Sequence, residues 1–154
     1  MDLKELVAGY APDPAVSALL DNTRVVILCG VTGAGKDTVQ NELFKKYHYE
    51  RIITSTTREP REENGVMEQD GKEYYFYSLE RAVQMVRDRQ YFEVAVVHGT
   101  IYGVTAQEIS RIHTSHSIAM TDVDYQGVDY FKQHAPSTLA IFIIPPSYDV
   151  TELL

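Results

Sequence analysis

The sequence has little of three things: cysteine, positive charge and long apolar runs. Cys29 is its only cysteine, so no disulfide can form within the chain, and its place in an apolar run predicts a buried, reduced thiol. With 14 Lys and Arg against 22 Asp and Glu, the formal net charge is −8, which argues against nucleic acid as the main partner. No stretch has the length of a membrane span, and the N-terminus lacks the features of a secretory signal. We therefore expect a soluble, cytoplasmic protein that binds neither membranes nor nucleic acid.

Signals of zinc or covalent chemistry are also missing. The five histidines have no paired cysteine or carboxylate at the spacing of a zinc site, and no nucleophile elbow is present. At 154 residues, without repeats or low-complexity tracts, the chain has the length of one domain. On so acidic a chain an anion site must be locally basic, and Lys36, Arg58 and Arg61 lie in polar loop segments.

Three apolar runs predict a parallel sheet. Such runs are typical of strands buried on both faces, and they cover residues 24–29, 117–123 and 138–144. Helical patterns cover 36–47, 79–89 with Ser78 as the cap, 105–113 and 125–134. Strands that alternate with helices predict an α/β fold built in layers.

The middle of the chain departs from this alternation. Residues 72–77, 91–98 and 100–104 read as short strands with turn signals between them, and a small, partly antiparallel β insertion is the simplest account. The polar segment 59–72 is expected to be an exposed loop. The first twenty residues are expected to form a loose arm and a short helix packed on the core.

A glycine-rich loop directly follows the first apolar run. Residues 30–38 read Gly-Val-Thr-Gly-Ala-Gly-Lys-Asp-Thr, between a predicted strand and a predicted helix. Gly30, Gly33 and Gly35 let successive amide N–H groups converge on phosphate oxygens, and Lys36 adds a positive charge for the β- and γ-phosphates. The motif in this setting predicts a nucleotide-phosphate site, with a glycine-rich turn that binds nothing as the alternative.

One position of the loop is unusual. The residue after the lysine is normally a Ser or Thr whose hydroxyl meets Mg²⁺, but here it is Asp37, and the hydroxyl comes one place later at Thr38. The residues expected to surround the phosphates are Gly30, Thr32, Gly33, Ala34, Gly35, Lys36, Asp37 and Thr38.

Residues 54–61, Thr-Ser-Thr-Thr-Arg-Glu-Pro-Arg, are the best candidate for a second anion site. Arg58 and Arg61 lie three apart after four hydroxyl residues, so guanidinium and hydroxyl donors can reach one phosphate. An exposed loop with unrelated arginines is the alternative. Tyr74 and Tyr102 could each donate a phenol hydroxyl to an anion, although tyrosines in strands more often pack half-buried.

Three carboxylates complete the candidates. Glu93 is the one charge in the apolar strand 91–97, and a carboxylate is the acceptor that a guanine edge needs; an outward-facing glutamate is the alternative. Asp122 and Asp124 follow the second apolar run, at the strand end where ligands bind in open α/β sheets. Asp122 suits the water shell of Mg²⁺. Asp124 suits a substrate hydroxyl, with capping of the helix near Tyr125 as the alternative.

Taken in order, these segments resemble the guanylate kinase family. The matching stretches are 30–38, 55–61, 71–76, 92–95, 99–103, 122–127 and 141–146, which together cover nearly everything from residue 24 onward. The resemblance implies a single domain with a three-layer P-loop NTPase core. In it, 23–53 and 115–154 would form the core, 54–114 the acceptor-nucleotide region and 1–22 an N-terminal arm.

The resemblance also implies an activity and its residues. The enzyme would move the γ-phosphoryl group of ATP onto GMP with Mg²⁺, forming GDP and ADP. Lys36, Arg58 and Asp122 would be catalytic, and Asp37, Thr38 and Asp122 would support the metal. The acceptor nucleotide would contact Thr54, Arg58, Arg61, Tyr74, Glu93, Tyr102, Val104 and Asp124, with the arginines and tyrosines on its phosphate and Glu93 on its guanine.

Two departures from the family bear on the acceptor. Val104 stands where guanylate kinases usually place a Ser or Thr that bonds the guanine carbonyl, which weakens guanine discrimination. Val104 and Asp37 together make the chain similar to ribose 1,5-bisphosphate phosphokinases, the runner-up. A third hypothesis is a non-catalytic guanylate-kinase-like module that binds phosphopeptides. Such modules typically have a degraded phosphate loop, whereas this loop keeps its glycines and Lys36.

The end of the chain is a further departure. Family members continue past the Pro-Pro run at 145–146 into a lid with arginines that close over ATP, and then to a final helix. This chain ends at Leu154, with only the start of that helical region at 147–154. We therefore expect phosphate and acceptor binding with weak or no turnover. No pattern indicates an oligomeric state.

Overall fold

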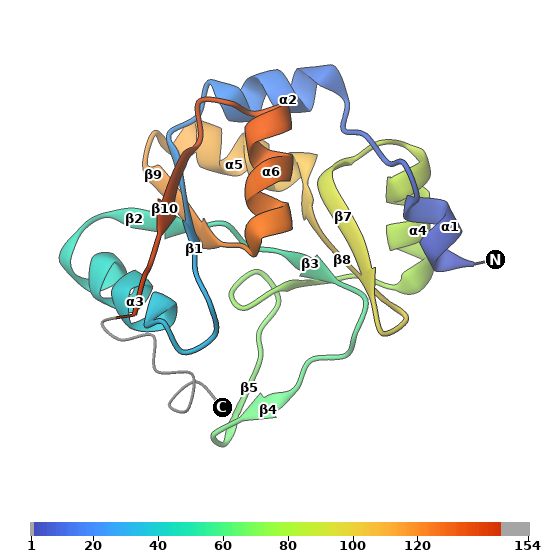
Figure 1. Cartoon of the computed structure of the whole chain (residues 1–154). Coiled ribbons are helices and arrows are strands. Elements are labelled where there is room, and N and C mark those ends of the chain that lie inside the picture. The colour runs from blue at the N-terminus through green and yellow to red at the C-terminus, as the bar shows by residue number, and fades with distance from the viewer. Residues whose placement is uncertain (1, 146–154) are drawn as a thin grey trace. The chain divides into compact units, whose positions relative to one another are not determined.

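The computed structural model describes residues 2–145 (Figure 1), so the helical start expected at 147–154 lies outside the described residues. The contacts divide the chain into two compact units. The first, which we call the mixed-sheet unit, combines Met1–Leu19 with Ile52–Arg111. The second, the parallel-sheet unit, combines Leu20–Arg51 with Ile112–Leu154. None of the described helices is long and apolar enough to cross a membrane.

The parallel-sheet unit is built on four parallel strands. Their order is β10 (Leu139–Phe142), β1 (Val25–Cys29), β9 (Ile118–Asp122) and β2 (Tyr49–Arg51). β1 has a neighbour on each side and is almost entirely buried, as its run of Val, Ile and Leu predicts for a strand covered on both faces. The α/β prediction with a parallel sheet is therefore confirmed.

Two helices of this unit start beside segments that carry predicted site residues. α3 (Lys36–Lys46) follows the glycine-rich loop, α6 (Tyr125–His134) follows β9, and both pack against β1. Asp124 caps α6 by accepting a hydrogen bond from the Gly127 N–H at 2.8 Å. The helices α2 (Pro14–Asp21) and α5 (Ala106–Ser115) each contain a boundary between the two units.

The edge strand β10 corrects one expectation. The apolar run 138–144 predicted a strand buried on both faces, but Leu139 and Phe142 are 56% and 57% exposed. β10 lies at the edge of the sheet, with β1 as its one neighbour among the described strands. An apolar run alone does not distinguish a central strand from an edge strand.

The mixed-sheet unit confirms the predicted, partly antiparallel insertion. Its strands lie in the order β6 (Tyr75–Phe76), β3 (Ser55–Thr56), β8 (Thr100–Thr105) and β7 (Tyr91–Val97). β3 is parallel to β6 and antiparallel to β8, and β7 and β8 form a hairpin. The hairpin turns at His98 and Gly99, whose φ angles of 49° and 78° are those of a tight two-residue turn.

Two helices, one from the N-terminus and one from the middle of the chain, pack on this second sheet. Ser78 caps α4 (Leu79–Arg87) as predicted, by accepting from the Arg81 N–H at 3.2 Å. α1 (Leu3–Val7) packs against β7 and α4, beside which it lies in Figure 1. The N-terminal residues expected on the core thus belong with the mixed sheet.

The exposed segment 59–72 contains a hairpin that the loop prediction missed. β4 (Glu62–Glu63) and β5 (Val66–Met67) pair antiparallel across Asn64 and Gly65, whose φ angles are 52° and 78°. Asn-Gly is a strong signal for this turn, so the hairpin was readable from the sequence. All four of its paired residues are exposed, including the apolar Val66 and Met67, as expected for an exposed segment.

Candidate functional site

The glycine-rich loop has a backbone conformation that strongly favours glycine at three positions. Gly33 and Gly35 have φ angles of 81° and 93°, in the left-handed region, and Gly35 forms the N-cap of α3. A Cβ on Gly30 would lie 2.5 Å from the Ile143 carbonyl oxygen. Because the first N–H groups of a helix have no partner within the helix, the loop and the start of α3 form an arrangement that suits an anion.

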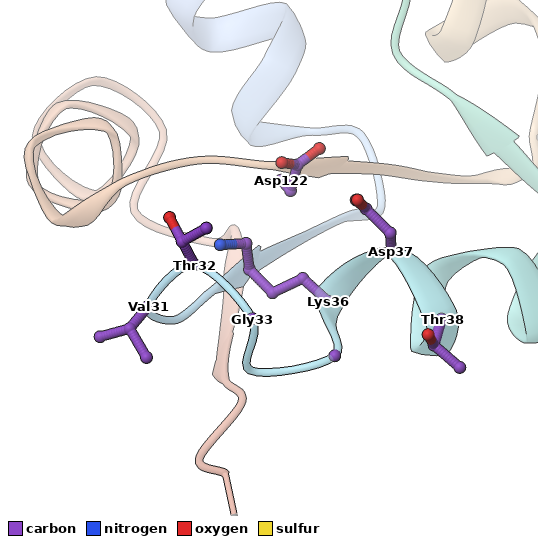
Figure 2. Close-up of a pocket in the computed structure, with 8 residues that line it drawn as sticks. Val31, Thr32, Gly33, Lys36, Asp37, Thr38 and Asp122 are labelled. Carbon is purple, nitrogen blue, oxygen red and sulfur yellow. The ribbon is translucent and has the colours of Figure 1, made fainter. Parts of the chain in front are cut away.

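This loop and the end of β9 enclose a pocket of about 390 Å³ (Figure 2). The pocket is lined by Val31, Thr32, Gly33, Gly35, Lys36, Asp37, Thr38 and Asp122. Lys36 bends over the loop, and its Nζ donates to the Gly30 carbonyl at 2.6 Å. Six of the eight residues predicted to surround the phosphates thus line one pocket, together with Asp122.

Charges of both signs meet in the pocket. Figure 2 shows the Lys36 ammonium and the Asp37 carboxylate on the side of the loop that faces Asp122, whereas the Thr38 side chain is directed away from Asp122. No three His, Cys, Asp or Glu residues within the described range could hold a metal by themselves. Two carboxylates beside an anion site nevertheless match Mg²⁺, which takes one or two protein oxygens and completes its shell with phosphate oxygens and water. The residues present therefore fit a Mg²⁺-bound nucleotide.

Strand register brings the predicted acceptor residues to one face of the mixed sheet. Glu93 is paired with Val104 across β7 and β8, and Tyr102 with Thr56 across β8 and β3. Paired residues share a face, as do residues two apart on a strand, so Glu93, Val104 and Tyr102 lie on the same side. Thr56 also pairs with Phe76, so Phe76 lies on this side too, and Thr54 and Tyr74 are each two residues before one of this pair. We call this side of the sheet the acceptor face.

Arg58 lies over the aromatic rings of this face. Its guanidinium carbon is 4.9 Å from the centre of the Tyr74 ring and 5.9 Å from that of Phe76. The Tyr74 and Tyr102 rings meet edge to face, with centroids 6.2 Å apart. The structure thus brings together one cation and two phenols that the sequence analysis assigned to a single phosphate.

Arg58 has a partner that the sequence analysis missed. Its Nη1 and Nη2 donate to the two carboxylate oxygens of Glu68 at 2.6 and 2.7 Å, and the two side chains are only 12% and 11% exposed. Glu68 also accepts from the Arg61 backbone N–H at 2.8 Å. These bonds, the one from Arg58 first, lower the pKa of Glu68 to about 2, and Glu68 in turn raises the pKa of Arg58. No spacing rule links a loop arginine with a carboxylate ten residues on.

The sequence analysis also missed a second carboxylate, Glu108, which is buried inside the mixed-sheet unit. It accepts from the Ile53 N–H at 2.8 Å, the Tyr75 hydroxyl at 3.0 Å and the Arg111 guanidinium at 2.8 and 2.9 Å. Burial first, and then Glu108, raises the pKa of Tyr75. These bonds hold the backbone directly before Thr54, so Glu108 stabilises one border of the acceptor face.

The remaining predicted residues lie elsewhere. Arg61 is exposed, and its backbone N–H donates to Glu68. Asp124 belongs to the parallel-sheet unit, where its side chain caps α6, the alternative that the sequence analysis left open. Its contact with an acceptor stays a prediction.

Comparisons with known proteins agree on one family. The guanylate kinase family model matches residues 22–154. The chain is 33% identical over 129 residues to a guanylate kinase from Rickettsia bellii, covering 83% of this chain and 65% of that protein. It is 32% identical over 135 residues to a guanylate kinase from Sus scrofa, covering 86% and 66%.

A solved structure gives the same result. The crystal structure of a guanylate kinase from Anaplasma phagocytophilum matches with a TM-score of 0.61 and 27% identity, covering 85% of this chain and 64% of that one. In each of these three matches the chain spans slightly less than two thirds of the length of the protein it resembles.

Proposed function

The chain belongs to the guanylate kinase family, and from this premise we propose that it binds ATP and GMP and transfers the γ-phosphoryl group of ATP to the GMP phosphate. The products are GDP and ADP. The observation that carries the proposal is the acceptor face, where Arg58 lies over Tyr74 within reach of Tyr102, on the same side as Glu93. We also assign the protein to the cytoplasm, in keeping with the free, buried Cys29.

On the ATP side, the loop amides and Lys36 neutralise the phosphates. The N–H groups at the start of α3 bind phosphate oxygens, and Lys36 exchanges the Gly30 carbonyl for the β- and γ-phosphates. Asp37 and Asp122 would hold Mg²⁺ through its water shell, and the ion supplies charge neutralisation between the phosphates. Asp37 thereby takes the place of the usual hydroxyl.

On the acceptor side, Arg58, Tyr74 and Tyr102 orient the GMP phosphate, and Glu93 accepts from the N–H groups of the guanine edge. Phosphoryl transfer needs little covalent help from the protein. Its rate depends on holding the attacking and leaving oxygens in line and on neutralising the charge that spreads over the transferred group. The chain's residues therefore act as binding and positioning groups.

Calorimetric titration of GMP, AMP and ribose 1,5-bisphosphate tests the acceptor. We expect GMP to bind most tightly, with a modest preference over AMP, because Val104 offers no hydrogen bond to the guanine carbonyl. Val104→Thr should increase that preference about fivefold, the usual net value of one hydrogen bond. Val96→Thr, which adds a hydroxyl to β7 away from the acceptor face, is the matched control and should change nothing.

Two results would replace the proposal. Tightest binding of ribose 1,5-bisphosphate would favour the phosphokinase that the chain resembles through Asp37 and Val104. Phosphopeptide binding that persists in Lys36→Ala, together with unchanged nucleotide affinities in that variant, would favour an adaptor module.

A further inference from the structure

The strand that carries Glu93 contains a β-bulge. Tyr91 pairs with Thr105, but Glu93 pairs with Val104, so β7 has one extra residue between two consecutive pairs. The bulge allows the neighbours Tyr91 and Phe92 both to be buried, at 1% and 0% exposure. A one-residue slip moves every following side chain to the other face of a strand, so the bulge determines that Glu93 shares a face with Tyr102.

The bulge is held by a residue from the N-terminus. The Tyr10 hydroxyl donates to the Tyr91 carbonyl at 2.7 Å and accepts from the Tyr91 N–H at 3.0 Å. β7 is the last strand of its sheet among the described strands, so one side chain satisfies both backbone groups of Tyr91, beside the bulge, as a neighbouring strand would. Burial raises the pKa of Tyr10, so its hydroxyl keeps the proton that it donates at neutral pH.

Apolar packing keeps Tyr10 in place. Leu6, Val7 and Tyr10 pack against the buried cluster of Met85, Val86 and Tyr91. Leu3 and Leu6 pack against a second cluster formed by Ala82, Val83 and Ile101. This segment precedes residue 22, where the family match begins.

The bulge is also bonded to the other strands of the acceptor face. The Tyr91 hydroxyl lies 3.5 Å from Ser55 Oγ, and the Ser55 hydroxyl donates to the Gly103 carbonyl at 3.0 Å. Ser55 is three residues before Arg58, and Gly103 lies between Tyr102 and Val104. A continuous set of contacts therefore connects Tyr10 with three of the segments that carry predicted acceptor residues.

We propose that Tyr10 is a positioning residue for the acceptor face: it fixes the β7 bulge and so sets the orientation of Glu93 and the affinity for the acceptor nucleotide. The inference rests on the proposed function for the identity of that nucleotide. Tyr10 itself touches no substrate. Its effect passes through the backbone of Tyr91.

Tyr10→Phe in the full chain tests this role, because it keeps the packing and removes only the hydroxyl. The change removes both bonds between the Tyr10 hydroxyl and the Tyr91 backbone. We expect GMP affinity to fall about fivefold, within the range of net hydrogen-bond contributions, while the affinity for a non-hydrolysable ATP analogue stays constant. Amide hydrogen exchange across residues 91–94 should become faster. Tyr77→Phe is the matched control, since its ring packs against the same cluster but its hydroxyl does not bond to Tyr91.

The outcomes are distinguishable. Unchanged exchange across 91–94 in Tyr10→Phe would overturn the inference whether or not GMP binds. Faster exchange with unchanged GMP affinity, or an equal loss of GMP and ATP-analogue affinity, would also overturn it, because both describe a merely structural residue. If the wild-type chain binds no GMP, the proposed function fails, and the exchange data still decide whether Tyr10 holds the bulge.

Discussion

Arg58 shows how one residue can be prepared for an anion before any ligand is present. Glu68 takes one N–H from each terminal nitrogen, the Glu59 carbonyl takes a second from Nη1, and the ring of Tyr74 lies beneath the plane. These contacts, together with a side-chain hydrogen bond to Tyr102, fix the guanidinium in one orientation beside the phenols. Fixing the orientation in advance lowers the entropy that binding would otherwise cost.

The ion pair makes stability depend on pH in a defined window. The pKa of Glu68 is about 2 in the folded protein, against 4.5 for an ordinary glutamate, so the folded state binds this proton less readily than the unfolded state does. The stabilisation is therefore fully present above pH 4.5 and is lost as the pH falls toward 2. Glu68→Gln should lower the melting temperature at pH 7, and the difference from wild type should shrink between pH 4.5 and 2.

Thermal unfolding followed by circular dichroism at several pH values measures this effect. Glu62→Gln, an exposed change in the neighbouring hairpin, is the control and should leave the melting temperature within about 2 °C of wild type at every pH. A constant gap between Glu68→Gln and wild type down to pH 2 would show that the charge of Glu68 is not what stabilises the loop.

Single residues were predictable where local chemistry determines them. Lys36 and the loop glycines follow from a motif in its strand and helix context, and Ser78 follows from the start of an apolar periodicity. Glu68 and Tyr10 were not found, because their partners are selected by tertiary contacts. The bonds of Tyr10 span 81 positions, and no sequence pattern encodes such a distance.

At the scale of elements, the β7–β8 hairpin determines the acceptor face. Gly103 is the position in this hairpin where the packing leaves no space for a side chain. A Cβ at Gly103 would lie 2.5 Å from the Glu93 carbonyl oxygen and 2.6 Å from the Tyr91 ring. These neighbours are backbone and a buried ring, and displacing either of them would cost folding free energy. Gly103 thus has a packing reason to be a glycine.

Gly103→Ala should destabilise the fold by about 1–3 kcal/mol through overpacking and should disturb the bulge. Gly99→Ala, in the turn of the same hairpin, has open space around its Cβ and should cost only the strain of its positive φ, about 1–2 kcal/mol. Urea unfolding gives the stabilities, and hydrogen exchange across 91–94 separates the two effects. Equal exchange in both variants would contradict the packing argument.

Elements were predicted in proportion to their length and periodicity. β1, β9, α3, α4 and α6 follow from apolar runs or helical spacing and were placed within a few residues. β2 and β3 have three and two residues, and β3 is Ser-Thr, so hydrophobic patterning contains no signal for them. Such strands exist because partner strands supply the hydrogen bonds: β9 pairs with β2, and β6 and β8 pair with β3 on its two sides.

At the scale of the whole molecule, the chain has a high net negative charge, yet the edge strand β10 of the parallel sheet is apolar. The chain carries a formal charge of −8, which opposes association between copies. Around β10, however, large apolar side chains remain exposed: Leu139 at 56%, Phe142 at 57% and Ile144 at 65%. An apolar edge strand offers unpaired backbone groups beside a hydrophobic surface, the combination that promotes pairing with another chain.

We therefore expect the 154-residue chain to self-associate as its concentration rises, and more strongly at high salt, where repulsion between the acidic copies is screened. Phe142→Lys should suppress this association, because a charge on an edge strand opposes edge-to-edge pairing. Its effect on folding stability should stay within about 0.5 kcal/mol, since the side chain is exposed.

Sedimentation velocity over a concentration series at low and high salt measures both trends. Leu79→Lys adds the same charge at a comparably exposed position on the helix α4, away from any strand, so it controls for net charge alone. If the two lysine variants reduce association equally, overall charge is the cause, whereas a loss confined to Phe142→Lys identifies the β10 edge as the contact surface.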